Sequence, residues 1–256
     1  MSLWQSFIYF ALGAVLCWAA GAGFAWKGKK SLAVGLTAAG LAVFLAYILS
    51  MWFTLERPPL RTMGETRLWY ALFLPLAGLL VYLRYGYRWI LSFSTVLATV
   101  FVCVNLFKPE IHDKTLMPAL QSPWFAPHVI VYMFAYALLG AATLMALYAL
   151  LSRRADQDAM QRSTDELVAV GWAFLTFGML FGALWAKEAW GHYWTWDPKE
   201  TWAAVTWLGY LVHIHWRGQS RLRYCWLLLC FVLLQMCWWG INYLPAAQGA
   251  SVHTYG

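Results

Sequence analysis

The chain has 256 residues, of which 62% are hydrophobic types and only 11% are charged. A soluble domain carries roughly 25% charged residues, so this composition excludes a water-soluble globule, and it is too apolar for a disordered chain. The five cysteines are too few and too scattered for a disulfide scaffold. The formal net charge of +7 is typical of basic loops between membrane spans. We therefore expect a polytopic membrane protein with the lipid bilayer as its surroundings and no nucleic-acid partner.

Eight segments are long and apolar enough, or nearly so, to cross a bilayer, which needs about 20 apolar residues per helix. They are 4–26, 31–53, 68–83, 89–107, 128–151, 167–186, 201–216 and 224–244, and none contains Asp, Glu, Lys or Arg. Two of them, 68–83 and 201–216, are short and predict tilt or burial inside the bundle. The two-residue alternation of a membrane barrel is missing. The sequence predicts an all-α membrane protein, a single domain over 1–256 with about eight transmembrane helices.

Loop charge predicts the orientation of these helices. The loops after the first, third, fifth and seventh segments hold most of the basic residues: Lys27, Lys29, Lys30, Arg84, Arg88, Arg153, Arg154, Arg162, Arg217, Arg221 and Arg223. The positive-inside rule puts these loops in the cytoplasm, and hence both termini on the outer side. The outward loop 54–67 is an exception, because Arg57, Arg61 and Arg67 lie in it. These arginines indicate an anionic ligand.

Two sequence patterns predict where helices begin. Residues 163–166, Ser-Thr-Asp-Glu, resemble a capping box that opens the sixth helix. Asp197, Pro198 and Glu200 have the spacing of an N-cap, a first helical position and an N3 carboxylate, and they predict the start of the seventh helix.

The densest motif is the predicted external loop 185–202, which holds five tryptophans in 18 residues. An aromatic belt at the membrane interface is one interpretation, but a belt spreads its rings over several helices. The concentration on one short connection favours an apolar platform on which a large flat ligand stacks. The positive end of the seventh helix would hold the ligand's anionic groups.

Two histidines are predicted at the same membrane face as this loop. His128 begins the fifth segment, and His253 lies in the C-terminal tail. Two neutral imidazoles that converge on one platform would make an axial pair for haem iron, although either one alone is more often a solvated polar residue.

The seventh segment holds two further histidines. His215 lies 18 residues after Asp197, about 27 Å along a helix, and so at the cytoplasmic end. His213 points to nearly the opposite helix face, so the two cannot bind one iron together. One of them is an interfacial filler, and position alone does not say which.

The remaining histidines and cysteines have simpler interpretations. His112 lies in a polar loop and is expected at the surface, and His192 is expected to be structural. The cysteines all fall in apolar segments without a C-x-x-C pattern and are expected to be buried small apolar residues: Cys17, Cys103, Cys225, Cys230 and Cys237.

Several of these stretches together resemble one family. Trp190-Gly-His-Tyr-Trp194-Thr-Trp196-Asp197-Pro-Lys-Glu-Thr-Trp202 looks like the tryptophan-rich WWD signature of haem-handling proteins, in the form of the CcsA (ResC-like) cytochrome c biogenesis family rather than the CcmC branch. Three more stretches agree: Trp124 to His128 with Met133 and Tyr136, His215-Trp-Arg217, and Val252-His253-Thr-Tyr255-Gly256. The resemblance covers about residue 124 to the end.

The resemblance implies roles for single residues. His128 and His253 would be the external axial ligands, and His215 would receive haem b within the membrane. The haem-binding surface would comprise Trp190, Gly191, Trp194, Trp196, Asp197 and Trp202. Candidate contacts for the haem propionates are Arg57, Arg61 and Lys199. The partners would be a CcsB-like membrane subunit and apocytochrome c.

One stretch departs from the family. Where the family commonly shows His-x-Pro-Leu leading to Tyr-Glu-Ser, this chain has Arg57-Pro-Pro-Leu60 and then Gly64-Glu-Thr66. We therefore do not expect this segment to have the role that it has in the family. The departure indicates a divergent branch of that family.

The function implied is the transfer of reduced haem to the outer face and its attachment to the Cys-x-x-Cys-His motif of apocytochrome c, as a haem lyase (holocytochrome c synthase) subunit. An alternative is a haem transporter or haem-binding regulator without attachment chemistry. A b-type electron-transfer subunit is disfavoured, because it needs paired histidines on facing helices. A bacterial inner membrane is expected, with a thylakoid membrane as the alternative.

Overall fold

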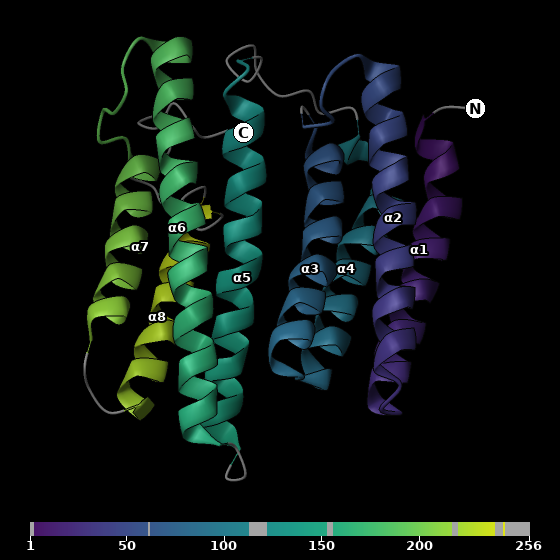
Figure 1. The fold of residues 1–256 in the computed structure, drawn as a ribbon. Helices are drawn as coiled ribbons and strands as arrows, with labels where there is room; N and C mark the ends of the chain where they lie inside the picture. Colours follow the sequence, from purple (N-terminus) through teal and green to yellow (C-terminus); the bar gives the residue numbers. More distant parts are fainter. Residues whose placement is uncertain are drawn as a thin grey trace. The chain divides into compact units, whose positions relative to one another are not determined.

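The computed structural model describes residues 3–60, 62–112, 122–152, 156–216, 220–238 and 243. The chain divides into two compact units, Met1–Leu116 (unit 1) and Met117–Gly256 (unit 2). The helices are α1 (Leu3–Trp26), α2 (Lys30–Leu55), α3 (Met63–Tyr85), α4 (Arg88–Phe107), the short 3-10 helix η1 (Pro109–Ile111), α5 (Phe125–Leu151), α6 (Gln157–Trp190), α7 (Pro198–His215) and α8 (Ser220–Trp238). Every regular element in the described residues is helical (Figure 1).

The predicted fold class is confirmed. Within the described residues, seven helices are long and apolar enough to cross a membrane. The eighth, α7, has 18 residues and carries Glu200 in its first turn and His213 and His215 in its last turn. The protein is thus a polytopic membrane bundle, whereas its orientation and the single domain over 1–256 stay predictions.

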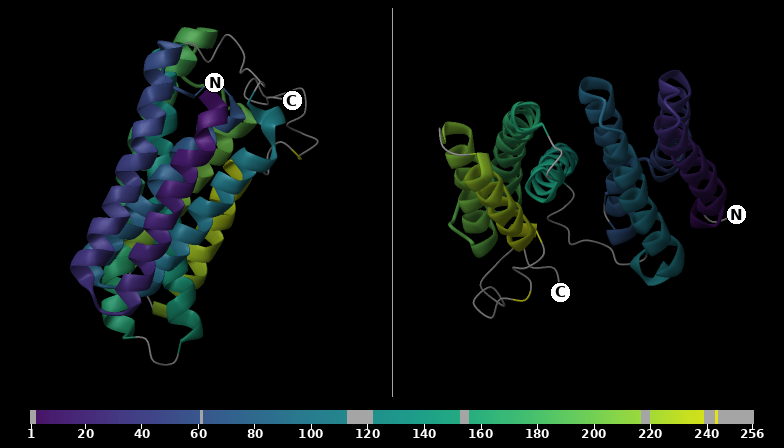
Figure 2. Two further views of the ribbon diagram at one scale, coloured as in Figure 1. Left: turned by 90° about the vertical axis from the view of Figure 1, so that its right-hand side faces the viewer. Right: turned by 90° about the horizontal axis from the view of Figure 1, so that it is seen from below.

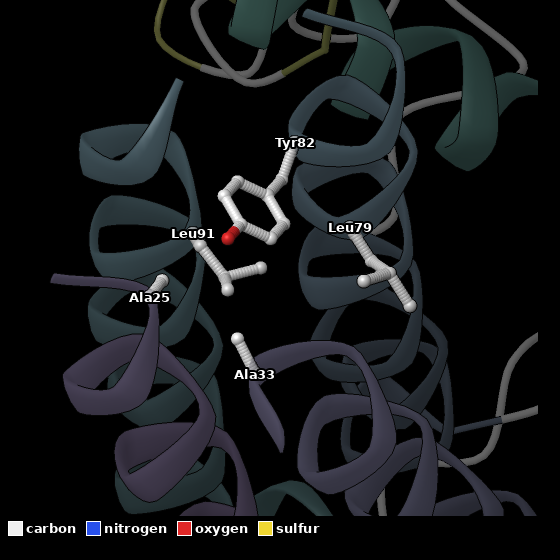
Figure 3. Packing of buried hydrophobic residues seen from close by; sticks show 5 residues of the cluster. All are labelled: Ala25, Ala33, Leu79, Tyr82 and Leu91. Atoms are coloured by element: carbon white, nitrogen blue, oxygen red, sulfur yellow. The ribbon is translucent and has the colours of Figure 1, made fainter. Parts of the chain in front are cut away.

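Unit 1 is a bundle of four helices. In it α1 packs against α2 and α4, and α3 packs against α4 and α2. Near one end of the bundle, a buried cluster joins all four helices through Ala25, Ala33, Leu79, Tyr82 and Leu91 (Figure 3). Alanines at two of the five positions let α1 and α2 approach the larger side chains of α3 and α4.

Unit 2 holds α5 to α8. Here α5 packs on α6 and α8, while α7 packs on α6 and α8. Figure 2 shows the four helices of this unit gathered side by side when viewed along their axes. The α5–α6 pair forms the most extensive contact of the unit and carries the candidate site.

The third helix begins earlier than predicted. It starts at Met63 rather than residue 68, because Thr62 and Glu65 form a capping box in which the Thr62 hydroxyl accepts from the Glu65 N–H at 3.1 Å. The charged Arg67 is therefore inside the helix. With 23 residues, α3 is not short, and the expectation of a short span there was wrong.

The sixth helix also begins earlier than predicted. Its N-cap is Asp156, whose carboxylate accepts from the Ala159 N–H at 3.1 Å. Ser163 and Thr164 lie one turn or more inside the helix, and their hydroxyls donate to carbonyls four residues earlier. The predicted capping box at 163–166 was therefore wrong, because a cap upstream extends the helix through it.

The connection between α2 and α3, where the sequence departs from the family pattern, is held by Arg57. Its guanidinium makes two hydrogen bonds of 2.9 Å to the carboxylate of Glu65. The Trp69 indole N–H donates to the carbonyl of Pro59 at 3.0 Å, and Leu60 is buried. This segment is a packed, ion-paired turn.

The α1–α2 contact depends on glycines at close approach. A Cβ at Gly40 would lie 2.6 Å from the Trp18 indole and 2.9 Å from the carbonyl of Ala14. A Cβ at Gly35, on the same helix, would have no neighbouring atom within 4 Å. Two glycines of one helix thus differ in whether a methyl group fits.

Gly40→Ala is expected to destabilise the protein by about 1–3 kcal/mol, since the methyl group forces the fully buried Trp18 ring away. Gly35→Ala is the matched control and is expected to leave the melting temperature in detergent unchanged or slightly higher. Equal melting temperatures for the two variants would contradict the close packing of α1 on α2.

Candidate functional site

Helices α5 and α6 lie side by side (Figure 1), and His128, in the first turn of α5, contacts α6 in the seam between them. Its Nδ1 atom is 2.8 Å from the carbonyl oxygen of Gly178. The ring lies against Trp185, with 5.5 Å between the centroids and 29° between the planes. It also meets Tyr132 edge to face at 4.8 Å. Contacts from both helices thus hold the imidazole, which is half-buried.

The seam is made of glycines on α6. A Cβ at Gly182 would lie 2.8 Å from Nδ1 of His128, and one at Gly178 would lie 2.8 Å from the Tyr132 ring. Gly178 and Gly182 have the G-x-x-x-G spacing that lets membrane helices approach closely. In an α-helix the side chain of residue i + 4 points back toward the N-terminus and lies over the carbonyl group of residue i. Glycine at 182 therefore exposes the Gly178 carbonyl to a second donor.

This hydrogen bond fixes the state of the His128 ring. A carbonyl oxygen can only accept, so Nδ1 carries the proton. In the neutral imidazole the lone pair then resides on Nε2, and a ring nitrogen with a lone pair is the form that binds a metal. Histidines that bind metals commonly donate their other N–H to a carbonyl in this way. The surroundings of His128 therefore fit an axial ligand for haem iron.

The predicted external loop connects α6 to α7. Helix α6 ends at Trp190, and Gly191 follows in the left-handed conformation, with φ of 84°. The Lys187 ammonium donates to the Gly191 carbonyl at 2.8 Å. Its Nζ also lies 5.4 Å from the centroid of the Tyr193 ring. The first half of the loop is thereby tied back to α6.

The second half of the loop is tied to α7. The predicted cap is confirmed: the Asp197 carboxylate accepts from the Lys199 N–H at 2.7 Å, and Glu200 accepts from the Asp197 N–H at 3.2 Å. The same Glu200 oxygen accepts from the Thr195 N–H at 2.7 Å. One buried carboxylate therefore fixes the backbone of two loop residues, Thr195 and Asp197.

The tryptophans of the loop form two groups. Trp190 packs edge to face on Trp185 at 4.8 Å, and Trp185 in turn contacts His128. Trp194 and Trp196 pack edge to face at 5.7 Å. Trp196 is 70% exposed and has a φ of 59°, a backbone strain that only the surrounding contacts can maintain. The structure thus holds a large indole toward the outside.

The other predicted site residues are placed as follows. Trp202, in the first turns of α7, and Lys199, in its first turn, are half-buried. The Lys199 carbonyl lies 3.8 Å from the Cys237 thiol of α8. The Arg57 guanidinium binds Glu65 in unit 1. Arg61 and His253 lie outside the described residues.

Sequence reasoning missed two features of this site. The first is the position of Trp185, which was counted with the loop tryptophans but lies inside α6, is 3% exposed and packs against the His128 ring. The second is the pair of glycines at 178 and 182, whose G-x-x-x-G spacing was the available signal. Among the described residues, no three His, Cys, Asp or Glu side chains come together as a metal site.

The structure separates the two histidines of α7. His213 is 1% exposed, and its Nε2 lies 3.1 Å from the carboxylate of Asp165 on α6. His215 is exposed, and its Nδ1 donates to the carbonyl of Leu211 at 3.0 Å. His215 therefore has the same tautomer as His128, with the lone pair on Nε2, whereas His213 uses Nε2 within the protein.

His213 belongs to a network that joins three helices. The Asp165 carboxylate also accepts from Arg223 of α8, at 2.8 Å. Arg223 is buried, with 7% exposed. The network locks the last turn of α7 between α6 and α8 and so fixes the direction in which His215 projects. His213 is the structural member of the pair that the sequence left open.

His213→Ala is expected to lower the free energy of unfolding by about 1–3 kcal/mol, because it removes a buried donor to Asp165 and leaves a cavity. His215→Ala is expected to leave it within about 0.5 kcal/mol, since this side chain is exposed. Thermal unfolding in detergent measures both. A larger loss for His215→Ala than for His213→Ala would contradict the assignment.

Comparison with known proteins indicates the family of this chain. The family model for cytochrome c assembly protein matches residues 5–247. A cytochrome c biogenesis protein CcsA of Chlamydomonas reinhardtii is 32% identical over 178 residues, 63% of this chain and 49% of that protein. The CcsA protein of Prochlorococcus marinus is 33% identical over 187 residues, 56% of this chain and 57% of that protein.

The match to a third relative covers a larger share of that protein. The CcsA protein of Oenothera parviflora is 30% identical over 220 residues, 66% of this chain and 68% of that protein. The chain spans about half the length of the first two relatives. The family model, by contrast, matches nearly all of this chain, across both units. The chain is therefore an integral membrane protein that belongs to the cytochrome c assembly protein family.

Proposed function

We propose that this protein acts in cytochrome c biogenesis: it brings reduced haem b to the outer membrane face and holds it for attachment to apocytochrome c. The observation that carries the proposal is the hydrogen bond from His128 Nδ1 to the Gly178 carbonyl. It prepares Nε2 to bind iron in a setting of indole and phenol rings, to which a porphyrin plane is complementary.

The second axial ligand of the proposal is His253. A six-coordinate iron with two imidazoles holds the haem through metal bonds at both faces. The tryptophans of the loop would then stack on the porphyrin plane, with Trp196 already directed outward. Lys199, at the positive end of α7, is the preferred propionate contact. Arg57 is less suited to this role, because Glu65 already occupies its guanidinium.

The attachment itself needs no nucleophile from this chain. Each thiol of the apocytochrome Cys-x-x-Cys-His motif adds across a haem vinyl group, so that sulfur bonds to one carbon and hydrogen to the other. The substrate histidine then replaces one axial ligand. The protein contributes position and exclusion of competing oxidation. It would act as a haem lyase subunit together with a CcsB-like membrane partner.

His215 is the proposed entry point for haem. Helix α7 has 18 residues, so His215 lies about 27 Å along the helix from the loop that begins it. The exposed ring presents Nε2 at the far end of unit 2 from His128. We place the protein in a bacterial inner membrane, with His215 on the cytoplasmic side and both termini on the outer side. A thylakoid membrane is the alternative.

His128→Ala is expected to reduce covalent haem in a co-expressed apocytochrome c by at least ten-fold, because the fixed axial ligand is lost. The purified variant is also expected to lose low-spin, six-coordinate haem from its visible spectrum. His253→Ala should act in the same way. His192→Ala is the control, because His192 is an exposed histidine of the tryptophan-rich loop between α6 and α7.

Normal cytochrome yield from both His128→Ala and His253→Ala would refute the attachment role. A product whose haem is extracted by acidic acetone would favour a haem transporter or haem-binding regulator instead. A thioether-bound haem resists that extraction, so one assay separates the two functions.

Gly182→Ala is expected to displace His128 without removing it. The new methyl group would lie 2.8 Å from Nδ1, so low-spin haem should fall several-fold in the purified protein. Gly171→Ala crowds Leu139 in the same helix seam at 2.8 Å, remote from His128. It is expected to lower stability and leave the haem spectrum unchanged. Equal spectra for the two variants would contradict the role of the Gly178 hydrogen bond.

A further inference from the structure

One end of unit 1 carries positive charge alone. The connections α1–α2 and α3–α4 hold five exposed basic side chains: Lys27, Lys29, Lys30, Arg84 and Arg88. We call these five residues the cationic end. Neither residues 1–55 nor residues 66–109 contain Asp or Glu. Among the described residues of unit 1, Glu56, Glu65 and Glu110 lie at the opposite ends of the helices.

The two connections form one surface. The Trp26 indole at the end of α1 donates to the Ser92 hydroxyl of α4 at 2.9 Å. Arg88 reaches the Trp26 carbonyl at 3.5 Å. Directly beneath lies the cluster that joins all four helices (Figure 3). The five charges are therefore held together by packing, rather than dispersed on independent loops.

Two helices begin at this end without a side-chain cap. Neither Lys29 before α2 nor Tyr87 before α4 makes a side-chain capping hydrogen bond, and no acidic residue lies in either first turn. In contrast, the N-caps of α3, α6 and α7 all accept from the helix backbone. The positive ends of two helix dipoles thus add to the five basic side chains.

Aromatic rings surround the charges. Trp26 is 58% exposed. Tyr85 and Tyr87 stack at 6.0 Å, and the Arg84 guanidinium lies 5.2 Å from the Tyr85 ring. Tyr85 and Tyr87 are half-buried. Trp and Tyr beside the ends of membrane-spanning helices are typical of the headgroup level of a bilayer. The cationic end is therefore expected at the depth of lipid phosphates.

We propose that the cationic end is a binding surface for anionic phospholipids, whose phosphodiester oxygens accept from its lysines, arginines and uncapped helix N–H groups. A lipid fits better than a soluble phosphate or an acidic protein, because charges and interfacial aromatics occur at the same helix ends. Basic side chains near a membrane surface each strengthen such binding by roughly five-fold.

The test uses the full chain in phosphatidylcholine nanodiscs with a small fraction of spin-labelled lipid. Electron paramagnetic resonance then measures the fraction of motionally restricted label for phosphatidylglycerol and for phosphatidylcholine. We expect the wild type to prefer phosphatidylglycerol several-fold, and we expect high salt to reduce this preference. Inorganic phosphate at millimolar concentration should leave it unchanged, which separates a lipid site from a site for the free anion.

Neutralising the cationic end should abolish the preference. The variant Lys27→Gln, Lys29→Gln, Arg84→Gln is expected to bring the two lipids to nearly equal association. Lys108→Gln is the matched control, since Lys108 is an exposed cation at the other end of α4. Unchanged circular dichroism would show that the variants fold. A wild type without preference, a preference that survives the triple change, or a preference lost in Lys108→Gln would each overturn the proposal.

Discussion

The close approach of α5 and α6 at Gly182 is the constraint on which the candidate site depends. Inside a helix each carbonyl already accepts from the N–H four residues later. A second donor reaches the Gly178 carbonyl because residue 182, one turn on, has no side chain to cover it. The His128 imidazole fills that space and donates Nδ1–H. The ring orientation, tautomer and burial of His128 therefore follow from two glycines on another helix.

The loop of tryptophans is also held by side chains that make more than one contact. The Glu200 carboxylate caps α7 and also accepts from the backbone of Thr195, so helix start and loop shape are one structure. Gly191 ends α6 in the left-handed conformation, and Lys187 holds its carbonyl. An apolar platform at a membrane surface needs such support, because exposed indoles would otherwise collapse on each other or insert into lipid.

Sequence patterns predicted features that depend on one segment of the chain and missed features that depend on contacts between helices. Apolar length located the eight helices, and the spacing of Asp197 and Glu200 located the start of α7, because both signals lie within one segment. The starts of α3 and α6 were placed too late, since Arg67 and Asp165 were treated as ends of spans. In the fold both lie inside helices. Whether His213 or His215 is buried depends on α6 and α8, which no pattern within α7 contains.

The ring nitrogens distinguish the histidines of unit 2 by one rule. His128 and His215 donate Nδ1–H to main-chain carbonyls, which leaves the lone pair on Nε2. His213 instead directs Nε2 to Asp165, which Arg223 also binds. Because a carboxylate attracts the proton of a histidine and a metal requires the lone pair, the first arrangement suits a ligand and the second a structural contact. The rings of His128 and His215 lie at opposite ends of the unit, which is the separation that the proposed entry and holding roles need.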